Sequence, residues 1–86
     1  MEPTEVIFYP LMTEAASLMV EKDNKLIFIV NLKAGKSDVK NAVEQLYEVK
    51  VDKITVLTTP QGEKKAFVKL KPEYRASDVA IKLGIL

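Results

Sequence analysis

The sequence predicts an α+β fold in which helices pack on a mostly antiparallel, four-stranded sheet. Polar and apolar residues alternate along 49–59 and 64–71, which is typical of strands with one buried face. Apolar residues within 39–46 instead recur at the spacing of a helix. A Pro-Gln-Gly turn at 60–62 joins the two strands as a hairpin, so they run antiparallel. The expected order is a short strand, a helix, a strand, a helix, two strands and a last helix.

The first part of the chain predicts a short strand and a helix. Residues 5–9 are mainly apolar and are followed by Pro10, which suits an edge strand or an extended arm. Thr13 is the expected N-cap of the helix, and Glu14 suits its positive end. Turn chemistry at 23–24 ends the helix. Three residues at helical spacing are expected to face the core: Ala15, Leu18 and Met19.

The central part predicts a buried strand and the most regular helix. Residues 25–32 form the strand, and the unbroken apolar run at 26–30 indicates burial on both faces. A loop at 34–36 follows, and Ser37 is the expected N-cap of the central helix. Four residues form the stripe of this helix that should face the core: Val39, Ala42, Val43 and Leu46.

The last helix is expected at 76–83, after Pro72 has ended the second hairpin strand. Gly84 is its expected C-cap, and Ile85 should make the apolar contact that accompanies such a cap. One side of the helix should pack inward through three residues: Val79, Ala80 and Leu83.

Composition limits the classes of function. The chain has 86 residues, which suits a single domain over 1–86, and 48% of them are hydrophobic, enough for a core. It has no cysteine and no histidine, which removes thiolate metal sites and the commonest general base. No apolar run is long enough for a membrane-spanning helix, and no signal-peptide pattern is present. We therefore expect a cytoplasmic protein with no cofactor, no metal and no membrane partner.

The second hairpin strand carries the strongest functional signal. It combines the aromatic Phe67 with four lysines: Lys64, Lys65, Lys69 and Lys71. Lysines beside an aromatic ring on a sheet can bind a sugar-phosphate backbone and stack a base, as RNA-binding sheets do. Two alternatives stay open. The lysines could only protect an edge strand from pairing with another chain, and Phe67 could be a core residue beneath a helix.

Two smaller charged clusters are also candidate sites. Lys36 and Lys40 lie one turn apart, off the apolar stripe of the central helix, and are candidates for phosphate contacts. The alternative is a solvated helix face with a Lys40–Glu44 pair. Three acidic residues around the first helix suggest a docking surface for a protein: Glu14, Glu21 and Asp23. Charge complementarity at the helix end explains Glu14 equally well.

Catalytic patterns are missing from the sequence. The serines have no histidine partner, although a serine–lysine pair stays formally open, and the three glycines form no phosphate-binding loop. Carboxylates are scattered and give no metal-binding motif. The net charge of +1 is low for a nucleic-acid binder, so the local distribution of lysines matters more than the total.

Taken in order, these segments resemble the universal large-subunit ribosomal protein L23 family in its short archaeal form. The resemblance covers nearly the whole chain, from the opening at 6–16 to the closing LGIL at 83–86. Its most specific part is KKAFVKLK at 64–71, followed after seven residues by Val79. The family signature there has two basic residues, Ala, an aromatic or aliphatic residue, Val or Ile, a basic residue and Leu.

This resemblance implies the family's α/β plait and a structural role in the large ribosomal subunit, with a monomer outside the ribosome. Family members bind large-subunit rRNA in its third domain, near the exit of the nascent-peptide tunnel and beside neighbouring ribosomal proteins. They also dock factors that meet the emerging chain. In archaea these would be the signal recognition particle and the nascent-polypeptide-associated complex. Bacterial members have a longer hairpin loop that reaches into the tunnel, and 59–64 is too short for that.

The functional residues carry over only in part. Thr13 and Glu14 match the family's Ser/Thr-Glu-Lys motif, but Ala15 occupies the lysine position. Thr55 stands where the family usually has Asn, and its hydroxyl is the expected replacement contact. The expected RNA-binding set is Thr13, Lys36, Lys40, Thr55, Lys64, Lys65, Phe67 and Lys69. The expected docking residues are Glu14 and Glu21. The alternative function is a small regulatory ligand-binding or protein-adaptor α/β plait, which would need a pocket or an anion-binding loop.

Overall fold

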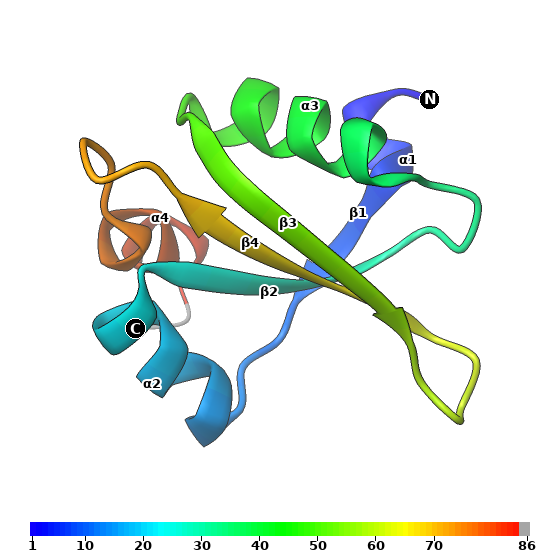
Figure 1. Ribbon diagram of the computed structural model, residues 1–86, viewed down its shortest axis with the longest axis horizontal. Helices are drawn as coiled ribbons and strands as arrows, with labels where there is room; N and C mark the ends of the chain where they lie inside the picture. Colours follow the sequence, from blue (N-terminus) through cyan, green and yellow to red (C-terminus); the bar gives the residue numbers. More distant parts are fainter. Residues whose placement is uncertain (85–86) are drawn as a thin grey trace.

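The protein forms a four-stranded sheet with four helices in a computed structural model that describes residues 1–84 (Figure 1). In chain order the elements are α1 (Pro3–Val6), β1 (Ile7–Pro10), α2 (Glu14–Asp23), β2 (Lys25–Val30), α3 (Lys36–Tyr47), β3 (Val51–Thr58), β4 (Lys64–Leu70) and α4 (Ala76–Leu83). The strand order is β1-β2-β4-β3, and each of the three pairings is antiparallel. The predicted α+β class is therefore confirmed, and β1 is an edge strand as expected.

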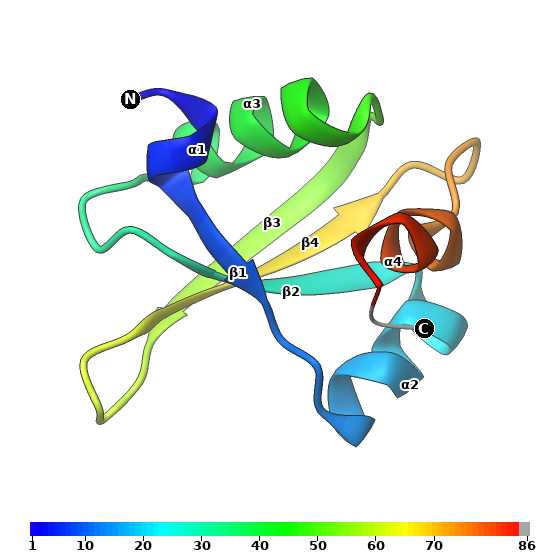
Figure 2. The ribbon, with the colours of Figure 1, turned by 180° about the vertical axis from the view of Figure 1, so that it is seen from behind.

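The core lies between one face of the sheet and the helices. Alternate residues of β2 and β4 supply the sheet side of this core: Leu26, Phe28, Val30, Ala66, Val68 and Leu70. The helix side comes from α2, α3 and α4: Val20, Val39, Ala42, Val43, Ala76, Val79 and Ala80. Phe28 also stacks on Tyr47 of α3, with ring centroids 5.7 Å apart. Helix α4 lies behind the sheet in Figure 1 and in front of it in the reverse view of Figure 2.

The local signals of several elements are confirmed. Thr13 caps α2, because its hydroxyl oxygen accepts a hydrogen bond from the backbone N–H of Ala16 at 3.1 Å. Asn24 ends α2 in the left-handed conformation, and Gly84 ends α4 in the same way. Gly62 has a φ of 85° in the hairpin turn, which a residue without a Cβ adopts at low cost. The expected contact of Ile85 lies outside the described residues.

The start of the central helix was predicted wrongly. Gly35, not Ser37, is the N-cap of α3, and Ser37 is the second residue of the helix. The Asp38 carboxylate accepts a hydrogen bond from the Gly35 backbone N–H at 3.0 Å. In a capping box, the side chain of the third helical residue accepts a hydrogen bond from the backbone N–H of the N-cap, and Asp38 does this here. It fixes the helix start without a serine hydroxyl.

Two apolar patterns were also misread. On α2 the buried residues are Ala16 and Val20, whereas Leu18 of the predicted stripe is 49% exposed. This ten-residue helix is only weakly amphipathic, so its packing against β2 and α4, rather than its own pattern, sets its rotation. The helix α1 was not predicted at all, because the apolar residues at 5–9 suggested a strand. Pro3 suits the first turn of a helix.

The remaining stripes agree with the structure in most positions. Val39, Ala42 and Val43 of α3 are buried, but Leu46 at the end of the stripe is exposed. Val79 and Ala80 of α4 are buried, and Leu83 packs against the core. The prediction that both faces of β2 are buried is confirmed, since Ile27 and Ile29 on the second face are buried as well.

Candidate nucleic-acid interface

The sheet has a second face, directed away from the core. Side chains that alternate with the core residues point to it, and by strand register they form three rows across the strands. We call this surface the open face and define it by Tyr9, Lys25, Ile27, Ile29, Lys53, Thr55, Leu57, Lys65, Phe67 and Lys69. Tyr9, Lys53, Thr55, Leu57 and Lys69 are exposed. The face therefore combines cationic, aromatic and apolar side chains that solvent can reach.

Phe67 occupies the middle row of the open face. It lies opposite Ile27 on β2 and Thr55 on β3. The ring is only partly exposed, but it does not belong to the core cluster between the sheet and the helices. The exposed hydroxyl of Thr55 lies beside it. This row offers a ring for stacking next to a hydrogen-bonding group.

Tyr9 brings a second aromatic ring to the same face. It lies opposite Ile29, which in turn lies opposite Lys65. The Tyr9 hydroxyl donates a hydrogen bond to the Glu63 carboxylate at 2.8 Å, so the ring spans from the edge strand to the hairpin. That hydrogen bond, with lesser effects from desolvation and the Glu63 charge, raises the pKa of Tyr9. The sequence did not mark this residue, because its partner is 54 positions away.

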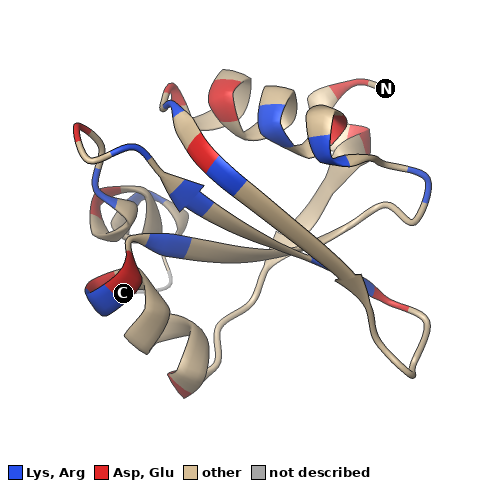
Figure 3. Cartoon of the chain, viewed as in Figure 1, with Lys and Arg blue, Asp and Glu red and all other residues tan. Residues whose placement is uncertain are grey.

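The third row consists of three lysines on three neighbouring strands. Lys25 on β2 and Lys53 on β3 both lie opposite Lys69 on β4. Figure 3 shows blue segments on these strands at the same end of the sheet. Of these three lysines, only Lys69 was predicted from the sequence as an RNA contact. Lys25 and Lys53 were missed because their relation to Lys69 exists only once the strands are paired.

Lys64 is separated from the other lysines of its strand. Lys64 lies on the same face of the strand as the buried Ala66 and Val68. Its ammonium group donates a hydrogen bond to the carbonyl oxygen of Ala34. It therefore holds the loop before α3 on the core side of the sheet. Lys65 and Lys69 lie on the open face, so the structure brings these two together and leaves Lys64 apart.

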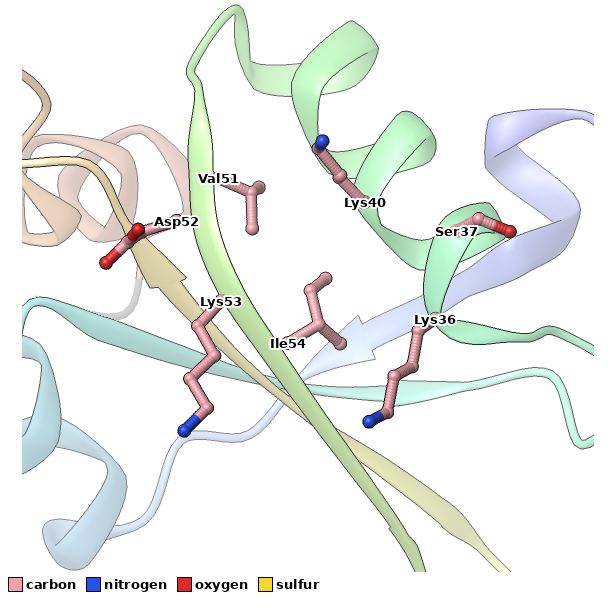
Figure 4. A pocket seen from close by; sticks show the side chains of 7 residues that line it. All are labelled: Lys36, Ser37, Lys40, Val51, Asp52, Lys53 and Ile54. Carbon is pink, nitrogen blue, oxygen red and sulfur yellow. The ribbon is translucent and has the colours of Figure 1, made fainter.

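A cavity of about 200 Å³ lies between α3 and β3 (Figure 4). Its lining residues are Lys36, Ser37, Lys40, Val51, Asp52, Lys53 and Ile54. Lys36 and Lys53 extend in the same direction on either side of Ile54, whereas Lys40 points the other way. Glu44 accepts a hydrogen bond from the Val51 backbone N–H at 3.0 Å, and no Lys40–Glu44 ion pair occurs within residues 1–84. Lys36, Lys40 and Lys53 thus line one cavity. Lys53 also belongs to the lysine row.

Helix α2 presents a separate surface. Glu14, Leu18 and Glu21 are exposed and recur at positions i, i+4 and i+7, so they lie along one side of the helix. Thr13 is exposed at its start, and its hydroxyl already accepts the capping hydrogen bond. These residues are far in sequence from the lysines of β4, and no lysine of the open face belongs to their helix.

Residues 1–84 contain no group of three or more carboxylate, histidine or cysteine side chains placed to hold a metal ion. A helix with the length and apolar character needed to span a membrane is likewise not found in this range.

Comparison with known proteins gives these surfaces a family context. The sequence model of the family described as ribosomal protein L23 matches residues 5–81. The chain is also 47% identical over 85 residues to the large ribosomal subunit protein uL23 of Methanococcus aeolicus, and the match covers 99% of each chain. The matched region includes the whole open face, the cavity between α3 and β3, and the exposed side of α2.

Proposed function

The chain belongs to the ribosomal protein L23 family, and we propose that it binds large-subunit ribosomal RNA through the open face of its sheet. As a member of this family it is a structural component of the large ribosomal subunit, is not an enzyme, and is cytoplasmic. Within that role, we assign RNA binding to residues 1–86 as a single domain. The RNA is the third domain of the large-subunit rRNA, near the exit of the polypeptide tunnel.

One observation carries the proposal: Phe67 is partly exposed on the open face between Lys65 and Lys69. An aromatic ring can stack an unpaired base, and the flanking ammonium groups can neutralise its phosphates. Thr55 adds a hydroxyl that can hydrogen-bond a base edge or a ribose. Stacking and charge together suit an RNA surface, and the two isoleucines of the open face are already buried, so they offer no apolar patch to a protein partner.

The test is binding to a transcript of the third domain, compared with a competitor RNA of equal length, at several salt concentrations. We expect selective binding that weakens as salt rises, because each phosphate contact releases counterions. Equal and weak binding to both RNAs would contradict the proposal.

We further propose that the exposed side of α2 docks factors that meet the nascent chain, among them the signal recognition particle and the nascent-polypeptide-associated complex. Two carboxylates flank the apolar Leu18 there, so a basic groove with an apolar floor would complement the helix. Hydrogen bonding and charge would set the register, and Leu18 would supply apolar contact area.

Glu14→Gln tests the docking proposal with little structural change, because Glu14 makes no hydrogen bond through its side chain within residues 1–84. We expect the variant to assemble into large subunits normally but to recruit the signal recognition particle less well in a pelleting assay. Glu73→Gln, in the turn before α4, is the matched control. Normal recruitment by Glu14→Gln would count against the docking role.

A further inference from the structure

We propose that the RNA backbone crosses the strands of the sheet, passing over Lys25, Lys69 and Lys53 in turn, and then rounds the β3 edge to reach Lys36 on α3. This path rests on the proposed function and specifies how the open face holds its partner. It differs from a path along the hairpin strand, which the lysine-rich segment 64–71 suggests when it is considered alone.

The register of the three lysines is the first argument. Residues directly opposite on neighbouring strands have Cβ atoms about 4.5–5.5 Å apart, and like charges in such pairs repel. Lys69 has a lysine opposite it on each side. No carboxylate forms an ion pair with any of the three within the part of the chain that the structure describes. The row is therefore electrostatically unfavourable in the free protein, and a polyanion would relieve it.

The position of Lys69 in the sheet excludes the usual structural reason for a lysine on a strand. Lysines on edge strands prevent pairing with another chain. Lys25 and Lys69, however, lie on β2 and β4, which are the two inner strands of the order β1-β2-β4-β3. Lys69 has a strand partner on each side, whereas Lys25 pairs with β4 alone, because the last pairing of β1 is that of Pro10 with Phe28. Edge protection therefore does not explain Lys69, the centre of the row.

The size of the row points to a polymer rather than a single anion. Neighbouring strands are about 4.8 Å apart, so the row spans roughly 10 Å across three strands. One phosphate group cannot contact both ends of that span. Successive phosphates of one RNA chain can, and the adjacent row then places Phe67 beside the backbone to receive a base.

The cavity between α3 and β3 continues the row. Lys53 belongs to both, and Lys36 extends beside it across Ile54 (Figure 4). Ser37 lines the same cavity and offers a hydroxyl. Asp52 also lines it, but its carboxylate points away from Lys36. The space between the two ammonium groups therefore suits the next phosphate, and the backbone reaches α3 by this route.

The experiment compares four variants on the path with one control off it. The path variants are Lys25→Gln, Lys69→Gln, Lys53→Gln and Lys36→Gln, and the control is Lys82→Gln on α4, which lies on the core side of the sheet (Figure 2). Affinity for the third-domain transcript is measured over a range of salt. Each path variant should lower the salt slope by about 0.7–0.9 and weaken binding roughly fivefold to eightfold at about 0.1 M salt. The control should leave both unchanged.

A second measurement needs no RNA. Lys69→Gln removes the central charge of the row, so its midpoint of thermal unfolding should exceed that of the wild type at low salt. The difference should vanish near 1 M salt, where the screening length is about 3 Å. Lys82→Gln should show no such salt-dependent gain. A lower midpoint for Lys69→Gln at low salt would overturn the argument from repulsion.

The outcomes separate this inference from the proposed function. Selective wild-type binding with unchanged salt slopes in the four path variants would overturn the path and leave RNA binding intact. A wild-type protein without selectivity for the transcript would overturn both.

Discussion

Asn24 connects three elements through one side chain. Its backbone ends α2 with a φ of 56°, and its amide donates hydrogen bonds to the carbonyl oxygens of Tyr74 at 2.9 Å and Leu70 at 3.3 Å. Its side-chain oxygen accepts from the Ala76 backbone N–H at 2.7 Å, at the start of α4. One residue thus holds the end of α2, the end of β4 and the first turn of α4 together.

Asn24→Ala should lower the free energy of unfolding by about 2–4 kcal/mol, because three hydrogen bonds are lost and alanine is strained at a positive φ. Urea unfolding measures the change. Asn24→Gly should lose less, since glycine tolerates the backbone conformation but not the lost hydrogen bonds. Asn41→Ala on the exposed side of α3 is the matched control. A loss below about 0.5 kcal/mol for Asn24→Ala would contradict this assignment.

Phe67 and Phe28 provide a second comparison at the residue scale, because they lie on opposite faces of the sheet. Phe67→Leu should weaken binding to the third-domain transcript by about 1–3 kcal/mol through lost stacking, with little effect on unfolding. Phe28→Leu should instead destabilise the fold, since Phe28 is fully buried and stacks on Tyr47. Binding titrations and urea unfolding of both variants would check this. Undiminished RNA affinity in Phe67→Leu would reject the stacking role.

The site could be predicted only in part at this scale. Lys65, Phe67 and Lys69 were found from the sequence because alternation along one strand places them together. The same alternation assigns Lys64 to the side of Ala66, so the position of Lys64 away from the other lysines is also predictable from the strand pattern. Tyr9, Lys25 and Lys53 could not be found, because their neighbours come from other strands and the strand register is not written in any local pattern.

At the scale of elements, the edge strand β1 is joined to the hairpin by the Tyr9–Glu63 hydrogen bond, which crosses β2 on the open face. The bond requires the neutral phenol, and it raises the pKa of Tyr9 above its ordinary value near 10. Its stabilising effect is therefore fully present below pH ~10 and is lost as pH rises through the higher pKa of the folded state.

Ultraviolet titration of the tyrosines should show two phenols with a raised pKa, those of Tyr9 and Tyr47, and only the Tyr9 titration should disappear in Tyr9→Phe. Glu63→Gln should bring that titration back toward the ordinary value, because the charge and the strong acceptor are both removed. Tyr47 serves as an internal reference, since burial rather than a carboxylate raises its pKa. If the pKa of Tyr9 is the same in Glu63→Gln as in the wild type, the Tyr9–Glu63 hydrogen bond is not its cause.

The loop before α3 is anchored by Lys64, which donates to the Ala34 carbonyl from the core side of the sheet. Lys64→Met should cost about 1–3 kcal/mol of stability, because this carbonyl loses a charged partner. It should leave the salt slope of RNA binding unchanged. Lys65→Gln, at the neighbouring position on the open face, should instead lower the salt slope of RNA binding and leave the stability unchanged. A reduced salt slope in Lys64→Met would show that Lys64 contacts phosphate after all.

Elements with strong local signals were predicted well, and those set by tertiary packing were not. The bounds of α4 and the hairpin between β3 and β4 follow from a glycine cap and a Pro-Gln-Gly turn, which act over a few residues. The rotation of α2 depends on which residues its neighbours can accept, and small Ala16 rather than Leu18 faces inward. A short helix such as α1 carries too few residues for a periodic pattern to appear.

At the scale of the whole molecule, we propose that one face of the sheet serves stability and the other serves binding. One face carries the core beneath the helices, and the other carries aromatic rings and lysines. This division explains why a net charge of +1 is compatible with an RNA-binding role. Most carboxylates lie on the helices and turns, with Asp52 on β3 as an exception, and lysines of three neighbouring strands lie at one end of the sheet (Figure 3). In the proposed function, a local potential rather than the total charge would attract the RNA.

Mapping the surface that contacts RNA is the direct test of binding by the open face. Chemical shifts of the backbone amides and side chains would be followed by NMR while a fragment of the third-domain rRNA is added. We expect the largest changes on the open face, at Lys25, Phe67 and Lys69, continuing to Lys36, with α4 unaffected. Changes confined to α2 and α4, with the open face silent, would contradict it.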